Sequence, residues 1–106
     1  YENEYFSIDV PQKWAGIWSF TEASDTSNLG TPSQPAKIYS FKHDPEGNVP
    51  FGGAQAIYVF PNGIPSKAES SPILKKLRGN VYLGAGAASG FFTTDNKPDR
   101  ATVKVK

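Results

Sequence analysis

The sequence predicts an α+β domain, in which an antiparallel β-sheet of about six strands has one short helix packed on it. Short segments in which apolar and polar residues alternate recur along the chain, and this period of two is typical of half-buried strands. Ten Gly and nine Pro among the 106 residues mark frequent turns between these segments. Because folded domains cluster around ~100–150 residues, we expect residues 1–106 to form a single domain.

The first half of the chain contains three predicted strands. Tyr5–Val10 alternates aromatic and β-branched residues with polar ones, and Pro11 stops the ladder because proline has no N–H to donate. Trp14–Glu22 alternates in the same way, and its closeness to the first strand predicts a hairpin between the two. Residues 23–36 show no regular period and predict a loop, after which Lys37–Lys42 is the third strand.

The second half contains the predicted central strand. Gly53–Phe60 is apolar on both faces towards its end, which indicates a strand that is covered on both sides. Val81–Leu83 is predicted as a further strand, and Phe91–Thr94 and Ala101–Val105 as a final hairpin. The last strand is typical of a protected sheet edge, with Thr102, Lys104 and Lys106 facing outward and Ala101, Val103 and Val105 facing inward.

One segment combines the signals of a helix. Ser71 suits the N-cap, Pro72 the first helical position, and Gly79 the left-handed residue beyond the C-terminus. The apolar stripe and the basic last turn consist of Ile73, Leu74 and Leu77, and of Lys75, Lys76 and Arg78. Ser66 and Glu69 also match a capping box, so an earlier start with a kink at Pro72 is an open alternative. The helix is short, and its stability must come from packing on the sheet.

Composition removes several classes of function. The chain has no Cys and one His, His43, which excludes disulfides, thiolate nucleophiles and thiolate metal sites. A formal net charge of +1 disfavours a nucleic-acid partner recognised through bulk electrostatics. We therefore expect no nucleic-acid partner, no cofactor and no metal, with calcium held by scattered oxygen atoms left open.

Two short motifs fall short of the chemistry they suggest. His43, Asp44 and Glu46 contain an acid and a base, but around a Pro in a turn these residues are more often exposed turn formers. The glycines of residues 84–90 are spaced one residue off the dinucleotide fingerprint, and a suitable following helix is not indicated. We therefore predict no catalytic residue and a protein that is not an enzyme.

Charge is distributed unevenly along the chain. Residues 1–25 hold five acidic residues and one lysine, whereas residues 67–106 hold eight basic and three acidic residues. A dipolar surface of this kind orients a partner, and two separately solvated faces are the alternative.

Aromatic residues are the candidates for ligand binding. Trp14, Trp18 and Phe20 share one face of the predicted second strand, and Tyr39 lies on the third. If these four side chains are exposed, they form a platform on which sugar rings or a peptide can stack. The alternative is that they belong to the core, together with aromatic residues of neighbouring strands.

The chain begins at Tyr1 and contains no Met, which predicts that a leader or a larger part of the protein precedes it. We expect an extracytoplasmic protein that is secreted, periplasmic or lipid-anchored. No apolar run approaches the ~20 residues of a membrane span, so we expect no transmembrane segment in the given chain.

The opening of the chain resembles a known superfamily. The residues that carry the resemblance are Phe6, Ile8, Val10, Pro11 and Trp14, an aromatic strand followed by Pro and Trp. This pattern is similar to the entry hairpin of the PsbP-like superfamily of α/β/α sandwiches, which includes many exported bacterial proteins and lipoproteins. The match covers about the first 20 residues, and beyond Val81 the chain departs from it, because no closing helix is indicated. The resemblance implies a binding or accessory role and supplies no catalytic motif.

These observations lead to three functional hypotheses. The first is a non-enzymatic exported domain that binds an unknown protein or glycan or acts as an accessory module. The second is a carbohydrate-binding module that uses Trp14 and Trp18. The third is a small inhibitor of a secreted hydrolase that presents the loop Ser24–Pro35 or the turn His43–Pro50.

Overall fold

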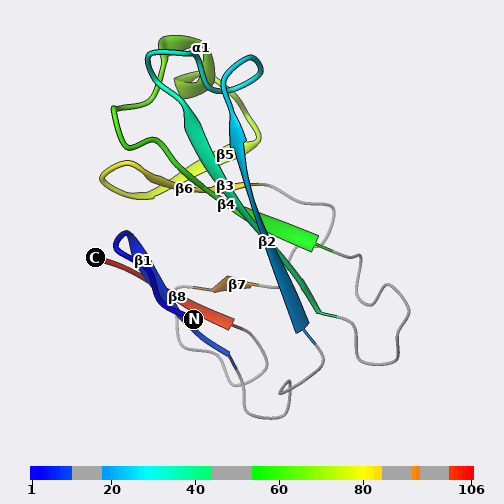
Figure 1. Cartoon of the computed structure of the whole chain (residues 1–106). Coiled ribbons are helices and arrows are strands. Elements are labelled where there is room, and N and C mark those ends of the chain that lie inside the picture. The colour runs from blue at the N-terminus through cyan, green and yellow to red at the C-terminus, as the bar shows by residue number, and fades with distance from the viewer. Residues whose placement is uncertain (11–17, 44–53, 85–91, 94–100) are drawn as a thin grey trace.

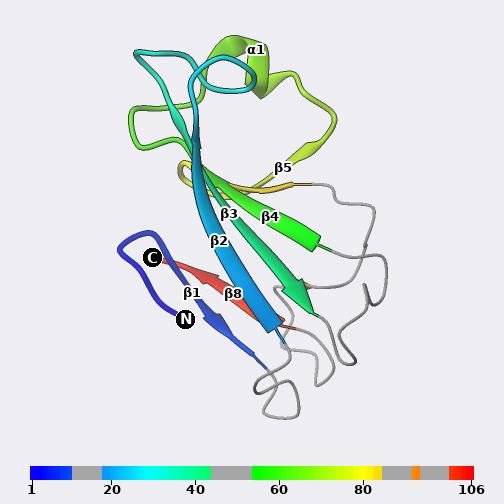
Figure 2. The same cartoon turned by 45° about the vertical axis from the view of Figure 1, so that its right-hand side comes forward.

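Two β-sheets pack face to face in this structure, a computed structural model that describes residues 1–10, 18–43, 54–84, 92–93 and 101–106 (Figure 1). The strands are β1 (Phe6–Asp9), β2 (Trp18–Asp25), β3 (Ala36–His43), β4 (Ala54–Val59), β5 (Leu74–Arg78), β6 (Val81–Gly84), β7 (Phe92–Thr93) and β8 (Ala101–Val105). The helix α1 (Ser66–Glu69) lies at the end of the larger sheet that is far from the smaller one (Figures 1 and 2). The predicted fold class, largely antiparallel strands with one short helix, is confirmed.

The larger sheet has the strand order β2-β3-β4-β6-β5, and every neighbouring pair is antiparallel. β4 lies at its centre, as the apolar pattern of Gly53–Phe60 predicts. Ile57 and Val59 are buried against the smaller sheet, whereas Phe60 is buried on the opposite face. A strand with apolar residues on both faces needs cover on both sides, and the central position supplies it.

The smaller sheet joins the two ends of the chain in the order β1-β8-β7. β8 lies in its centre and runs antiparallel to β1, with Phe6 opposite Val105. β7 pairs with β8 in parallel. Residues 1–3 fold back along β1, where the Ile8 amide donates to the carbonyl of Tyr1 over 2.7 Å. Both edges of β1 are therefore paired with backbone.

Both predicted hairpins are wrong. β1 pairs with β8, and β2 pairs with β3, because the apolar face of β1 is buried only when the two ends of the chain meet over the larger sheet. β7 and β8 are parallel, so they are not a hairpin, and β8 is a central strand rather than an edge. Thr102, expected to face outward, is 4% exposed there. β2 also continues through Asp25 into the predicted loop, because it pairs with β3 as far as Ala36.

The main apolar core lies between the two sheets. It takes Phe6, Ile8, Ala101 and Val103 from the smaller sheet and Tyr39, Phe41, Ile57, Val59 and Val81 from the larger one. The rings of Phe6 and Tyr39 meet edge to face, with centroids 5.2 Å apart. Burial of each Val, Ile or Phe side chain contributes ~1.5–3 kcal/mol, so this cluster is the main force that holds the sheets together.

A second, smaller apolar cluster lies on the outer face of the larger sheet. Phe60 and Tyr82 are buried there beneath Ala68 of α1, and their rings meet edge to face at 5.6 Å. α1 follows Pro65, which occupies the N-cap position without a side-chain hydrogen bond. With four residues in α1, no helix in the described part of the chain is long and apolar enough to cross a membrane.

The predicted helix between Ser71 and Gly79 is wrong, because Leu74–Arg78 forms the strand β5. The helix lies instead at the alternative start, Ser66. Leu74 packs against the outer cluster and Leu77 against the core between the sheets. Two leucines three positions apart share one face of a helix, but on a strand they point to opposite faces, and here each face has its own core.

Two glycines provide a test of the packing. A Cβ atom on Gly30 would collide with the backbone carbonyl of Asp25 and the amide nitrogen of Ala36, whereas one on Gly79, in the turn after β5, meets open space. Gly79 has a φ of 57°, which strains any other residue. We predict that Gly30→Ala lowers the free energy of unfolding by more than about 2 kcal/mol and Gly79→Ala by about 1 kcal/mol. Urea unfolding measures both, and equal losses would contradict the packing of the loop after β2.

Candidate functional site

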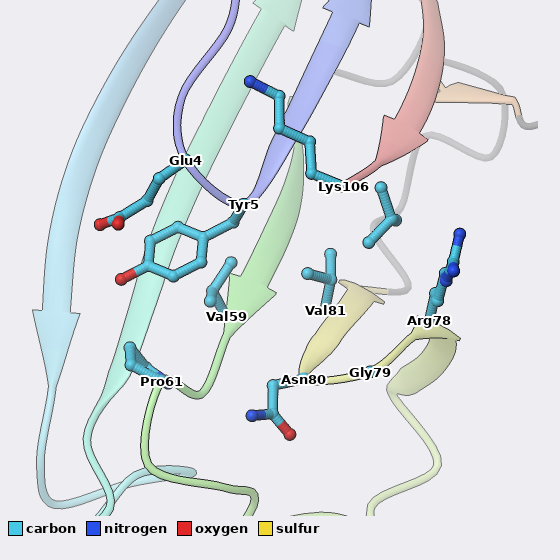
Figure 3. A pocket seen from close by; sticks show the side chains of 10 residues that line it. Glu4, Tyr5, Val59, Pro61, Arg78, Gly79, Asn80, Val81 and Lys106 are labelled. Carbon is cyan, nitrogen blue, oxygen red and sulfur yellow. The ribbon is translucent and has the colours of Figure 1, made fainter.

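A pocket of about 200 Å³ opens at the place where the two sheets part (Figure 3). Four segments form it: the residues before β1, the end of β4, the turn between β5 and β6, and the end of β8. Its lining residues are Glu4, Tyr5, Val59, Pro61, Arg78, Gly79, Asn80, Val81, Val105 and Lys106. We call this site the mouth pocket.

The floor of the mouth pocket is apolar. Val59 and Val81 of the larger sheet are 1% and 4% exposed, and Val105 of the smaller sheet is half-buried. The half-buried side chains of Tyr5 and Pro61 continue this surface. Such a floor favours an apolar group, because burying it removes apolar surface of both partners from water.

Backbone hydrogen bonds fix the walls. The Lys106 amide donates to the carbonyl of Tyr5 over 3.0 Å, which ties the end of β8 to the start of β1. The Phe60 amide donates to the carbonyl of Asn80 over 3.0 Å, which ties the end of β4 to the turn after β5. The pocket is thus preformed, and a ligand does not have to order it.

The rim of the mouth pocket is charged. Glu4, Arg78 and Lys106 are exposed, and Glu4 and Arg78 lie on opposite sides of the opening in Figure 3. Lys106 Nζ lies 2.6 Å from Glu2 Oε2, and this hydrogen bond lowers the pKa of Glu2. Arg78 has no acidic partner in the described part of the chain, so it is available to a carboxylate beside the pocket.

The structure describes the side chains of two of the four aromatic residues predicted to bind a ligand, Phe20 and Tyr39, and both lie away from the mouth pocket. Trp14 is outside the described residues, and Trp18 begins β2, where its backbone lies opposite His43. Phe20 is half-buried and Tyr39 is 3% exposed, and their rings stack with centroids 6.5 Å apart. The structure thus brings Phe20 and Tyr39 together against the core between the sheets, and neither lines the mouth pocket.

Sequence reasoning missed the mouth pocket, because its segments are distant in the sequence. One signal was present, namely the acidic start and the basic end of the chain. Glu2 pairs with Lys106, and Asp9 Oδ2 lies 3.0 Å from Lys104 Nζ. Both ion pairs lie across the β1–β8 ladder, and the register of that ladder brings Tyr5 and Lys106 together at the pocket.

The described residues supply no group of three His, Asp or Glu side chains that could hold a metal ion. Asp44 and Glu46, considered above for acid–base chemistry, lie outside the described residues, as does the turn after His43.

The loop after β2, part of the hypothesised inhibitor surface Ser24–Pro35, is organised by the carboxylate of Asp25. Its Oδ1 accepts from the amides of Ser27 and Asn28 at 3.0 and 2.8 Å, and its Oδ2 from those of Leu29 and Gly30 at 2.7 and 3.2 Å. Burial raises the pKa of Asp25, but the four backbone donors outweigh this effect and lower it to about 2.

We predict that Asp25→Asn lowers the free energy of unfolding by about 1 kcal/mol at neutral pH, because the amide nitrogen cannot accept hydrogen bonds. The pKa of the native carboxyl is depressed, so its contribution is present above the unfolded value of 3.8 and is lost as pH falls towards about 2. Urea unfolding across this range should show the two proteins converging. Asp9→Asn, which removes an exposed ion pair, is the control and costs less than about 0.5 kcal/mol. A constant difference down to about pH 2 would contradict the assignment.

Tyr39 provides the corresponding test in alkali. Burial, together with the negative charges of Glu22 and Glu4 and the nearby Tyr1 and Tyr5, raises its pKa to about 12. A raised pKa favours the neutral phenol, so this contribution is complete below the unfolded value of 10.0 and is lost as pH rises towards about 12.

Between about pH 9 and pH 11.5 the free energy of unfolding of the parent protein should fall as Tyr39 ionises on unfolding. We predict that the fall is smaller in Tyr39→Phe by about 1–2 kcal/mol. Urea unfolding at the two pH values gives this fall for each protein. The prediction fails if Tyr39→Phe loses as much free energy of unfolding between the two pH values as the parent protein does.

Comparisons of the chain with protein-family models, with curated proteins and with solved structures found no match. The resemblance of the opening residues to the PsbP-like superfamily therefore stays a prediction from the sequence.

Proposed function

We propose that this chain is a non-enzymatic binding domain that holds one apolar side chain of a partner protein in the mouth pocket. The observation that carries the proposal is the floor, where Val59 and Val81 of one sheet meet Val105 of the other. Small-molecule sites usually measure ~300–1,000 Å³. The mouth pocket, at about 200 Å³, suits a single side chain better than a whole cofactor.

The surroundings of the pocket support a protein partner. An apolar centre enclosed by an exposed polar rim is the usual anatomy of a protein interface. Arg78 supplies a planar cation at the rim, and arginine is one of the residues that most often contribute strongly to binding. Glu4 supplies an anion at the rim, so that the orientation of a charged partner is selected.

The two alternatives from the sequence rest on other surfaces. The inhibitor hypothesis gains support from the hydrogen bonds of Asp25, because a loop that is already ordered loses little entropy on binding. The carbohydrate hypothesis depends on Trp14 and Trp18, and it stays a prediction from the sequence.

The probe for the pocket is N-acetyl-leucine amide, titrated into protein with isotope-labelled valine methyl groups. We expect the methyl signals of Val81 and Val105 to shift at millimolar probe, because single side chains bind weakly. We expect Val105→Thr to weaken binding about fivefold, since a hydroxyl replaces a methyl group in the floor.

Val10→Thr is the matched control, because Val10 is also half-buried on the smaller sheet but lies beyond the opposite end of β1. It should leave probe binding unchanged. Shifts at Val10 as large as those at Val105, or no shift at either, would rule out the pocket as the site.

A further inference from the structure

The exposed edge of the larger sheet next to the mouth pocket is β5. We propose that an acidic, extended segment of the partner protein pairs with β5 as an additional strand. This inference rests on the proposed function, because it describes how the partner approaches the mouth pocket.

β5 is the last strand of its sheet. Within the described residues it pairs with β6 alone, so its other edge presents backbone N–H and C=O groups to an incoming strand. β1 in the smaller sheet differs, because residues 1–3 already cover its outer edge. Addition of a strand to such an edge is a common mode of peptide recognition, in which main-chain hydrogen bonds supply affinity and side chains supply specificity.

The charge of β5 selects an acidic segment. Lys75, Lys76 and Arg78 are exposed, and none has an acidic partner among the described residues. Lys75 lies opposite Leu83 and Lys76 opposite Tyr82, so consecutive lysines extend from opposite faces of the sheet. An incoming strand with acidic residues therefore finds a cation on either face.

Arg78 connects the edge to the mouth pocket. It is the last residue of β5 and also lies on the pocket rim, and the turn that follows it, Gly79 and Asn80, lines the same pocket. The register shifts between Lys76 and Arg78, and a β-bulge of this kind re-aims a side chain at the end of a strand. A segment that runs along β5 past Arg78 thus reaches the rim, where its next apolar side chain can enter the pocket.

The test uses a short capped peptide of alternating Glu and Val that ends in Leu and carries a fluorescent label, with anisotropy as the readout. We expect it to bind, and we expect a matched peptide with Lys in place of Glu not to bind. In a strand pair, alternate residues direct their N–H groups to the partner. Methylation of the backbone nitrogens in one alternate set should abolish binding, and in the other set should leave it unchanged.

The variant protein Lys75→Gln/Lys76→Gln should bind the acidic peptide about fivefold more weakly, because the glutamates of an alternating strand share one face and lose their cross-strand pair with the lysine on that face. Lys104→Gln is the control: it also removes an exposed lysine, on the smaller sheet, and should bind as the parent protein does. If the acidic peptide binds but N-acetyl-leucine amide does not, the pocket is overturned and the assignment of β5 stands. If N-acetyl-leucine amide binds but the acidic and basic peptides bind equally, the assignment of β5 is overturned and the pocket stands.

Three further outcomes would overturn the assignment of β5. Equal binding of both methylated peptides would show simple charge attraction without strand pairing. Equal binding of a single-stranded oligonucleotide of the same charge would show a general polyanion surface. Self-association of the chain that the peptide does not displace would assign the edge to a second copy of the chain.

Discussion

β1 and β8 come from opposite ends of the chain, and their antiparallel ladder holds the smaller sheet against the inner face of the larger one. Without this ladder, Tyr39 and Phe41 of β3 would lose the apolar surface that covers them. The ladder also places Tyr5 beside Lys106, so one wall of the mouth pocket exists only when the ends are paired. Core, pocket and the burial of Tyr39 therefore depend on a single nonlocal contact.

The sequence pattern correctly predicts those strands whose exposed and buried faces can be recognised from their own residues. A period of two identified β1, β3 and β4, and apolar residues on both faces placed β4 at the centre of its sheet. The helix predicted over Leu74–Arg78 is wrong because the spacing of its two leucines also matches the apolar stripe of a helix. As a strand, the same segment buries one leucine in each of the two apolar cores, which lie on opposite faces of the larger sheet. The predicted partners of β1 and β8 are wrong because proximity in the sequence favours hairpins, whereas the distant pairing buries Phe6 and Ile8 together with Ala101 and Val103.

The candidate site was harder to predict than the fold for a related reason. A row of alternating aromatic residues gives the same sequence pattern whether its face is exposed or covered. In the structure the face that carries Phe20 and Tyr39 packs against the core between the sheets. The floor of the mouth pocket consists of valines, which carry no chemical signature in a sequence. Its rim residue Arg78 was interpreted as part of a basic helix end, and on an edge strand the same residue faces a different set of neighbours.

The end-to-end ladder also has a consequence for folding. β2, β3 and β4 follow one another in the chain and pair as neighbours, so they close short loops, whereas β1 and β8 close a loop of nearly the whole chain. Contacts of such high sequence separation form slowly, and the smaller sheet is therefore expected to dock late on a larger sheet that has already formed. The pocket is lined by both sheets, so the proposed partner would bind only the docked form, and by linkage it would stabilise the closure of the chain ends.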